Sequence, residues 1–361
     1  MKMRSIVLAA MAVACGAAQA QSTSSVTLYG LVDGAVLHTN GVAAGTGRDG
    51  SVTKVVSGGI QGSRYGFKGA EDLGGGLKAV FDLENQFSVD TGAAKSSTQA
   101  FSRKADVGLA GSFGRVTLGR HTTFSYDVQS DLDPVQFANF NPLGNSGDAH
   151  VVNFFNYQVV DGRRDNSIKY TYDANGLSAG AMYAAGEVAE HTAASGSQGL
   201  RLGYNGQGWA VHGSYDGVRD AAGKRARGLT LGGLYTVGPV TGYLGLVQVK
   251  NDFASSGGFG QKNDVKWIGV RYAATNDLAF HAGYYWQKQS DTTNASGVAA
   301  PTKDGKAKTL SLLADYNLSK RTDVYAAFQH TGMKDGMVAA MSPSGVSKSV
   351  NTFMTGIRTK F

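Results

Sequence analysis

Residues that could carry out chemistry are present in this sequence, but the motifs that they form lack the flanking elements that such motifs require. Residues 45–50 read GTGRDG and fit the GxGxxG pattern of a dinucleotide site, which needs a strand before the glycines and a helix after them; we expect a loop here instead. The seven histidines form no pair at metal-ligand spacing on one element, and His-Glu-x-x-His does not occur. The sequence therefore predicts no enzyme active site, no metal site and no cofactor.

Charge, in contrast, is segregated in two stretches. Arg64 and Lys68 share one parity of the stretch SRYGFKG, whereas Tyr65 and Phe67 take the other, so a strand would place cations on one face and aromatic rings on the other. Residues 122–163 form the longest connection between predicted elements and contain no lysine or arginine before position 163. A connection of that length is usually functional or disordered. Its acidic residues include Asp127, Asp131, Asp133 and Asp148.

The elements that must position these charges are strands. The chain has 51 glycines, five prolines and 35 aromatic residues, and it has almost no segment with the period of a helix. This composition favours one large all-β structure. A chain of 361 residues exceeds the usual size of a β domain built around one solid core. A hollow barrel avoids that limit because its wall needs no solid core.

A strand count follows if each alternating run must end at turn residues. The connections then alternate between short and long, so that one rim is tight and the other carries large loops. Short connections include residues 72–75, 111–114, 173–176, 205–208 and 237–239. The sixteen predicted strands are residues 25–37, 62–71, 76–88, 102–111, 114–121, 165–172, 177–184, 199–204, 209–216, 227–237, 240–250, 262–274, 277–290, 306–317, 322–333 and 347–361.

These features are typical of outer-membrane barrels, which have an even strand number, short periplasmic turns and longer external loops. Strands of about 10 residues cross a bilayer when tilted, and closure leaves no unpaired edge in lipid. Apolar and polar side chains alternate as a lipid face and a water face require, for example in residues 77–84, 278–287 and 310–315. A soluble β-sandwich or a β-helix is the competing fold, but it would show longer apolar runs and less glycine. The sequence predicts a transmembrane β-barrel.

The first twenty residues have the pattern of a cleaved secretory signal. Lys2 and Arg4 precede an apolar stretch of nine residues, and Ala18-Gln19-Ala20 offers a small-residue cleavage site. The apolar stretch is too short for a helical membrane anchor, and a lipoprotein signal at Cys15 is the remaining alternative. Cleavage would remove the only cysteine and lower the formal charge from +7 to +5. That charge is too small to indicate a nucleic-acid partner.

The last eleven residues, NTFMTGIRTKF, have strand patterning up to the final residue. Phe353, Ile357 and Phe361 share one parity, and Arg358 and Lys360 share the other. Sixteen strands place both termini on the short-turn rim. We therefore expect the Phe361 ring to lie at the lipid interface and the two cations to point into the lumen.

Taken together, the residues resemble the trimeric general porins of Gram-negative outer membranes, in the form typical of beta-proteobacteria. The matching stretches follow one another over almost the whole chain. They are SSVTLYGLVDGAV from Ser24, GSRYGFKGAEDLGGGLKAVFDLE from Gly62, VGLAGSFGRVTLGRHTTFSYD from Val107, DNSIKYTY from Asp165, ADYNLSKRTDVYAAFQH from Ala314 and the closing TGIRTKF.

The resemblance implies one barrel, residues 21–361, that is exported by the Sec route to the cell outer membrane. Its third external loop, residues 122–163, would fold inward and narrow a water-filled pore for ions and small hydrophilic solutes. The expected partners are two further copies in a homotrimer, membrane lipid and lipopolysaccharide, and the barrel-assembly machinery, which would read Phe361 as an assembly signal. The apolar residues of the first strand, which could serve either the trimer or lipid, are Val26, Leu28, Val32 and Val36.

The resemblance also implies a constriction between the acidic loop and a basic wall. Arg64 and Arg120 match positions that line the constriction in the family, and Lys68 follows Arg64 on the same parity. Parity does not support Arg120, which is in phase with the apolar residues Val116 and Leu118. The expected acidic residues of the loop are Asp127, Asp131 and Asp133.

Two further positions leave the charge pattern open. In the stretch RRDNS, the family pattern favours Arg164 as a pore residue, whereas the phase of the strand that follows favours Arg163. Residues 134–138 read PVQFA and lack the carboxylate of the Pro-Glu-Phe-Gly-Gly element that many porins have, and Leu31 stands where some relatives have a basic residue. We therefore expect a weak anion preference.

Two other functions remain compatible with an outer-membrane barrel. One is an adhesin or structural anchor, and the other is an outer-membrane enzyme whose catalytic groups lie on a barrel rim without a sequence motif. Channel conductance in a planar bilayer distinguishes the porin from both.

Overall fold

A computed structural model describes residues 24–45, 48–143, 162–189, 194–252, 260–294 and 298–361. The predicted signal peptide, residues 1–20, lies outside the described residues, as do Asp148 and part of the GTGRDG stretch. Within the described ranges, no helix is long and apolar enough to cross a membrane.

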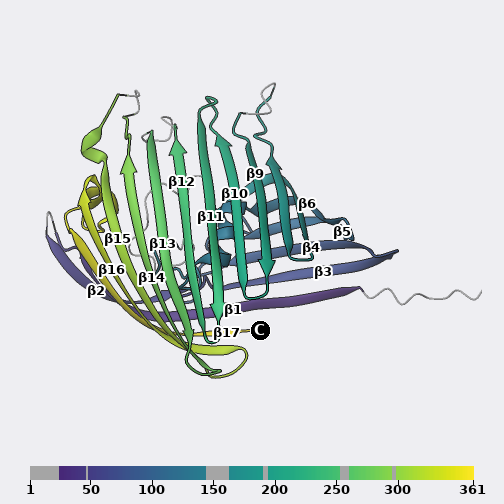
Figure 1. Cartoon of the computed structure of the whole chain (residues 1–361), viewed down its shortest axis with the longest axis horizontal. Helices are drawn as coiled ribbons and strands as arrows, with labels where there is room; N and C mark the ends of the chain where they lie inside the picture. Colours follow the sequence, from purple (N-terminus) through teal and green to yellow (C-terminus); the bar gives the residue numbers. More distant parts are fainter. Residues whose placement is uncertain (1–23, 46–47, 144–161, 190–193, 253–259, 295–297) are drawn as a thin grey trace, which may run out of the picture.

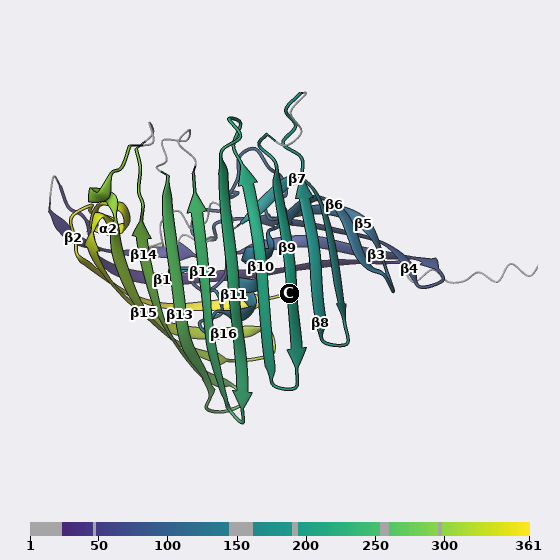
Figure 2. The same cartoon turned by 45° about the horizontal axis from the view of Figure 1, so that its top comes forward.

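The described chain is almost entirely antiparallel strand, and the sheet closes on itself (Figure 1). From β3 onward each strand pairs with the next, and β17 pairs with β1. Figures 1 and 2 show β10–β14 and β1–β5 as two sides of one cylinder. The strands are β1 (Ser25–Ala43), β2 (Asp49–Ser57), β3 (Arg64–Gly74), β4 (Leu77–Gln86), β5 (Lys104–Gly111), β6 (Gly114–Thr122), β7 (Arg163–Ala174), β8 (Leu177–Ala184), β9 (Ser197–Gly206), β10 (Trp209–Arg219), β11 (Arg225–Val237), β12 (Val240–Asn251), β13 (Gln261–Ala273), β14 (Leu278–Ser290), β15 (Gly305–Asn317), β16 (Thr322–Asp335) and β17 (Ser349–Lys360). The helices are α1 (Phe124–Leu132), α2 (Gly336–Met341) and the 3-10 turn η2 (Pro301–Lys303).

Two of these strands, β2 and β3, share one place in the wall. β2 pairs with residues 34–43 of β1, and β3 pairs with residues 25–31 of the same strand, so the two lie end to end. The wall is therefore sixteen strands around, which confirms the predicted barrel. The sequence prediction missed β2 and ended the first strand at residue 37, because the glycines at 45–50 indicated a loop and residues 51–56 after them do not alternate strictly between polar and apolar types.

Side chains alternate between a lipid-like outer face and a polar inner face. On the outer face, Leu202 is 65% exposed, Leu244 63% and Ile268 54%. Polar residues of the inner positions, such as Thr230 and Asn263, are buried. The apolar outer face is what hydrocarbon requires, and the polar inner face suits water or polar contents.

The two rims differ as predicted. Short turns close the rim that carries both chain ends, and the long connections lie on the opposite rim, at the top of Figure 1. The turn between β3 and β4 has three successive glycines, Gly74, Gly75 and Gly76, with φ of +87°, +60° and +80°. Residues with a Cβ rarely adopt this conformation, so glycine is required in this tight turn.

The seam between the chain ends is closed by backbone pairing. Phe361 N donates to Gly30 O and Gly30 N donates to Phe361 O, both at 3.1 Å. The Phe361 ring lies over Gly30 on the outer face, because a Cβ on Gly30 would come within 2.5 Å of the Phe361 Cζ. On the inner face, Arg358 Nε donates to Asp323 Oδ2 at 3.1 Å.

The buried apolar residues lie inside the barrel, where the segment between β6 and β7 enters the lumen. Val135, Phe137 and Leu143 of this segment pack with Trp267 and Tyr285 of the wall. A second cluster packs Ala138 and Phe140 against the wall residues Leu37, Tyr325 and Met354 and against Ile60. The described part of the predicted inward loop, residues 122–143 and 162–163, therefore fills part of an otherwise hollow barrel.

Candidate functional site

The first half of the inward segment is the helix α1, which lies against the inner face of β9–β12. Thr123 caps its N-terminus, with Oγ1 accepting from Tyr126 N at 3.3 Å. Ser125 N donates to Asp216 Oδ2 at 2.9 Å, and Trp267 Nε1 donates to Leu132 O at 3.1 Å. These wall contacts fix a helix that is too short to be stable alone.

The second half of the segment crosses to β13–β16. His281 Nδ1 lies 2.8 Å from Pro134 O, and Gln136 Nε2 donates to Asp315 Oδ2 at 2.8 Å. Gln329 Nε2 donates to Phe140 O farther along. Side chains of β14 and β16 thus satisfy backbone carbonyls of the segment, which would otherwise be buried without partners, and Asp315 of β15 holds the Gln136 side chain.

At the far side of the lumen the segment contacts residues 58–63, which connect β2 to β3 and also lie inside the barrel. Asn139 N donates to Ile60 O at 2.9 Å, and Asn139 Nδ2 donates to Gly58 O at 2.8 Å. The buried carboxylate of Asp33 holds this connection, because it accepts from the backbone N–H groups of residues 59, 60 and 61 at 3.1, 3.0 and 2.8 Å. The Tyr325 hydroxyl donates to the same carboxylate.

Between the inward segment and the opposite wall lies a cavity of about 370 Å³. It is open to the lumen and forms the neck of the described barrel. Its wall side is lined by charged residues of β3, β4, β7 and the start of β5, namely Arg64, Glu84, Arg103, Lys104 and Arg163. Its segment side is lined by Tyr126, Asp127, Ser130, Gln136, Phe137 and Asn139.

One carboxylate pairs with two guanidinium groups in this neck, and a third guanidinium lies beside them. Glu84 Oε1 lies 2.5 Å from Arg103 Nε, and Glu84 Oε2 lies 3.4 Å from Arg64 Nε. Arg103 Nη1 also donates to Gln86 Oε1 at 2.8 Å, while Arg163 Nε donates to Arg103 O at 2.9 Å. The wall of the neck therefore carries a fixed excess of positive charge.

The residues predicted for the basic wall divide into two groups. Arg64 and Arg163 line the neck cavity, and the Arg163 guanidinium lies 5.3 Å from the centre of the Tyr126 ring. Lys68, Arg120 and Arg164 do not line it. Lys68 lies over the Tyr29 ring, four residues beyond Arg64 on the same face of β3.

Arg120 and Arg164 are placed by a local irregularity. The register between β6 and β7 shifts between Gly119 and His121, and Asn166 adopts a φ of +54°. Arg120 Nη1 pairs with Asp165 Oδ1 at 2.5 Å, consistent with its phase with the outward-facing residues of β6. Arg164 Nη1 donates to Arg163 O at 2.9 Å.

The three predicted acidic residues do not all face the basic wall. Asp127 lines the neck but pairs with Lys169 Nζ at 2.7 Å. Asp131 Oδ2 pairs with Arg201 Nη2 of β9 at 2.9 Å, and Asp133 is buried on the far side. The arrangement thus differs from an acidic loop opposing a basic wall, because the carboxylates of the segment mostly contact the strands on which it docks.

Three charged residues of the neck, Glu84, Arg103 and Lys104, were not predicted from the sequence, and Arg103 is the one that strand parity misplaces. It is 7% exposed and lies one residue before β5 begins. Strand parity would have placed it with the outward residues of β5, but alternation does not extend beyond the end of a strand. The adjacent Lys104, on the inward parity, pairs with Asp82 Oδ2 at 3.2 Å.

Comparison with known proteins assigns the family. Residues 7–336 match the family model of the Gram-negative porins. The chain is 30% identical to outer membrane porin protein 32 of Delftia acidovorans, over 95% of this chain and 93% of that protein. The chain belongs to the Gram-negative porin family.

Solved structures agree with this porin fold. An anion-selective porin from Comamonas acidovorans is 27% identical and superposes with a TM-score of 0.73, covering 94% of this chain and all of that one. OmpF of Salmonella typhi, at 19% identity and a TM-score of 0.65, shares the fold. The protein is therefore an outer-membrane diffusion porin.

The structure of the porin gives no support to a metal site or to a nucleophile elbow among the described residues. Among the described residues, no group of three or more histidine, cysteine, aspartate or glutamate side chains could hold a metal ion. Residues 176–180 read GLSAG and fit a nucleophile-elbow pattern, which needs a strand, a sharp turn and a helix. They lie in the β7–β8 hairpin, so this serine has no such setting.

Asp133 gives the docked segment a dependence on pH. Burial raises the pKa of Asp133 to about 7, against the opposing effect of hydrogen bonds from Val135 N, the Tyr285 hydroxyl and the Asn141 amide. A carboxyl with a raised pKa favours the docked state when it is protonated. Docking is therefore most stable below about pH 4 and loses stability as the pH rises through about 7.

We expect the docked segment to lose on the order of 4 kcal/mol between pH 4 and pH 8. Trp267 reports docking, because its indole donates to Leu132 O. Its fluorescence, measured in a background where Trp209 and Trp286 are replaced by phenylalanine, should change over this pH range. The change should disappear in Asp133→Asn, and a change of equal size in that variant would assign it to another group.

Proposed function

We propose that this porin passes ions and small hydrophilic solutes with a weak preference for anions. The observation that carries the proposal is the lining of the neck, which has four cations, Arg64, Arg103, Lys104 and Arg163, against the two carboxylates of Glu84 and Asp127. The preference is weak because the two carboxylates and Asp82 offset much of that charge. The Comamonas acidovorans structure of similar fold is described as an anion-selective porin, which supports the same sign.

The mechanism follows from guanidinium groups that are fixed before a solute arrives. Arg103 is held by Glu84 and Gln86, and Arg163 is held by a backbone carbonyl and by the Tyr126 ring. An anion entering the neck replaces lost hydration with these donors and needs no rearrangement of the wall. At about 4 Å, two unit charges interact by roughly 4 kcal/mol at an effective dielectric of 20, so one or two such contacts offset part of the dehydration cost.

Salt-gradient reversal potentials test the proposed selectivity. A single charge contributes on the order of 0.5 kcal/mol to a passing ion at screened separations, so Arg64→Gln/Arg163→Gln should lower the anion-to-cation permeability ratio by roughly fivefold. Lys320→Gln/Arg321→Gln removes the same charge from the exposed β15–β16 turn and should leave the ratio unchanged. A cation preference in the unaltered porin would contradict the proposal.

We also propose a homotrimer, supported by the outer face of the first strands. Val26 is 70% exposed and Leu28 56%, and β1–β5 have no lysine or arginine at outward positions. A wall without outward cations is suited to contact with another copy. The same apolar residues also suit lipid, so conductance steps that occur in threes in planar bilayers are the supporting observation to seek. An absence of channel steps would instead favour the adhesin or enzyme function.

The terminal phenylalanine is proposed as a signal for the barrel-assembly machinery. Its ring is 49% exposed on the outer face and covers Gly30, so it is accessible at the seam before the barrel closes. Deleting Phe361 should remove most of the folded protein from the outer membrane. The measurement is the fraction of unheated membrane protein that keeps the mobility of the folded form in detergent gels. Phe353→Ser, which alters another outward phenylalanine of β17, is the matched control and should retain most of it.

A further inference from the structure

The neck carries aromatic rings as well as charge. Tyr126 of α1 and Phe137, five residues beyond the end of that helix, both line the segment side of the neck cavity. Their ring centroids lie 5.2 Å apart, and their planes are nearly perpendicular, at 87°. This edge-to-face contact is a favoured arrangement of two aromatic rings. The two rings form an aromatic corner in a cavity whose other lining residues are mostly charged or polar.

The backbone at Phe137 is held in an uncommon conformation. Gln136 and Phe137 have φ of +65° and +52°, which residues with a Cβ rarely adopt. Two contacts hold this turn: Ala138 N donates to Val135 O at 3.2 Å, and Gln136 Nε2 donates to Asp315 Oδ2 at 2.8 Å. Such conformations persist where the surroundings impose them, and they are concentrated at sites that hold ligands. The strained backbone thus coincides with a residue whose ring borders the neck.

Arg163 lies beside the aromatic corner and has free donors. Its guanidinium carbon lies 5.3 Å from the centre of the Tyr126 ring. Its Nε donates to Arg103 O at 2.9 Å, and within the described part of the chain its two terminal nitrogens have no hydrogen-bond partner. Two neighbouring guanidinium nitrogens match the two oxygens of one carboxylate. Arg163 therefore presents a fork that a carboxylate in the neck can occupy.

Arg64 offers a second contact on the same wall. Its Nε lies 3.4 Å from Glu84 Oε2, and its Nη1 donates to Gly62 O at 3.3 Å. Both distances are long for hydrogen bonds of a charged group, which are usually about 2.7–2.9 Å. Glu84 is held more closely by Arg103, at 2.5 Å. An anion in the neck can therefore contact Arg64 without breaking a strong ion pair.

The volume of the neck suits a solute with one ring. The cavity of about 370 Å³ lies at the lower end of the roughly 300–1,000 Å³ of pockets that hold small organic ligands. An inorganic anion would use only the cations of the wall, and a neutral aromatic solute would use only the rings. A planar ring with one carboxylate uses both. Its single charge also suits a lining in which carboxylates offset part of the positive charge.

We propose that, among the anions that this porin passes, the neck favours small aromatic monocarboxylates, of which benzoate is the simplest. The carboxylate binds the terminal nitrogens of Arg163, and the ring packs against Phe137 and Tyr126. The inference rests on the proposed anion preference and adds a class of solute to it. Aromatic rings stack on guanidinium planes and on one another, whereas a saturated ring of similar size lacks these contacts.

Block of the chloride current through single channels tests the proposal, with benzoate and cyclohexanecarboxylate as the probes. The two ions have the same charge and similar size, but only benzoate has an aromatic ring. One or two aromatic contacts correspond to a difference of roughly tenfold, so benzoate should have a dissociation constant smaller by about that factor. Relief of the block at higher voltage would show that the bound ion passes through the neck.

Removing the two rings should remove the preference. In Tyr126→Leu/Phe137→Leu the ratio of the two dissociation constants should fall to about one. A wider neck alone would not change this ratio, because both probes meet the same opening. If the double variant does not fold, Phe137→Leu alone should lower the ratio to about threefold.

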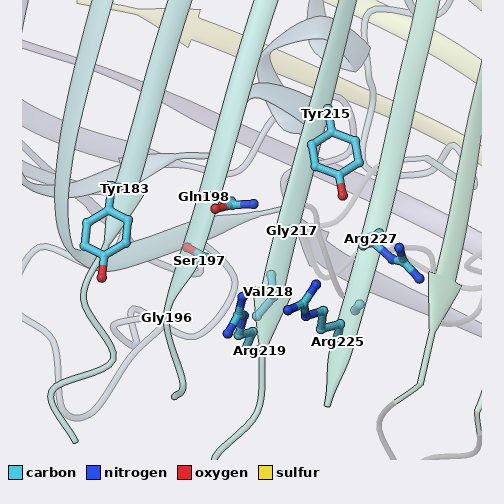
Figure 3. Close-up of a pocket in the computed structure, with 11 residues that line it drawn as sticks. Tyr183, Gly196, Ser197, Gln198, Tyr215, Gly217, Val218, Arg219, Arg225 and Arg227 are labelled. Atoms are coloured by element: carbon cyan, nitrogen blue, oxygen red, sulfur yellow. The ribbon is translucent and has the colours of Figure 1, made fainter. Parts of the chain in front are cut away.

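The outer face of the barrel offers a matched control. Tyr183 and Tyr215 line a separate cavity of about 120 Å³ beside Arg225 and Arg227 (Figure 3). The two tyrosines are 47% and 38% exposed on the outer face, so they lie outside the pore. Tyr183→Leu/Tyr215→Leu also removes two rings that lie near arginines, and it should keep the roughly tenfold ratio.

Reversal potentials in potassium chloride gradients, measured on the same channels, separate this inference from the proposed function. A ratio near one in unaltered channels that prefer chloride would overturn the inference alone. A cation preference would overturn the proposed function on which it rests. A ratio that stays near tenfold in Tyr126→Leu/Phe137→Leu would show that the aromatic corner does not select the solute, and it would likewise overturn the inference.

Discussion

Replacing Asp33 with asparagine should widen the pore and make its current unstable. The Asp33 carboxylate accepts three backbone N–H groups of residues 59–61, and this connection in turn holds the inward segment through Asn139. An asparagine keeps the size but places an amide donor against backbone donors. Because hydrogen bonds to a buried charge contribute about 1.5–3 kcal/mol each, we expect the docking of the segment to weaken by about 3–5 kcal/mol.

Single-channel recordings measure this effect as larger conductance and greater open-channel noise. Asp72→Asn is the matched control, because Asp72 Oδ1 also accepts a backbone N–H, that of Gly74 at 2.9 Å, but on the exposed short-turn rim. The control should conduct normally. Quiet channels of normal conductance in Asp33→Asn would show that the segment is held by its wall contacts alone.

The barrel was predictable because each strand carries its own signal. Alternation between lipid-facing and lumen-facing side chains is local, and every one of the sixteen predicted strands overlaps a strand of the structure. β2 was missed because glycines precede it, and α1 was missed because its residues favour a helix only weakly. Contacts from Asp216, Thr230 and Trp267, which are distant in sequence, hold that helix in place.

The neck was less predictable, because strand alternation is a local signal and the contacts of the neck are not local. Parity identifies which face a strand residue occupies, and it correctly separated Arg64 from Tyr65. Parity carries no information for Arg103, which precedes its strand, or for residues near the irregular register of β6 and β7. The partners of the segment's carboxylates, such as Arg201 for Asp131, depend on which wall the segment docks against. That choice is made by long-range packing, which no local pattern records.

The pairing of Glu84 with Arg103 should be the strongest interaction in the neck. Their side chains are 8% and 9% exposed, so removing one partner leaves a charge buried without its counter-ion. Breaking such a pair costs about 3–5 kcal/mol. Glu84→Gln should therefore lower the stability of the folded porin by that amount and, by leaving Arg64, Arg103 and Arg163 without a carboxylate, raise its anion preference.

A double-mutant cycle separates the pair from its surroundings. Arg103→Gln alone should also destabilise the porin, but it should lower the anion preference. Glu84→Gln/Arg103→Gln removes both buried charges, so its loss of stability should be smaller than the sum of the single losses by about 2–4 kcal/mol. Chemical denaturation in micelles measures stability, and reversal potentials measure selectivity. Additive losses would mean that Arg103 is held mainly by Gln86 and by its place in the wall, and that Glu84 acts only on passing ions.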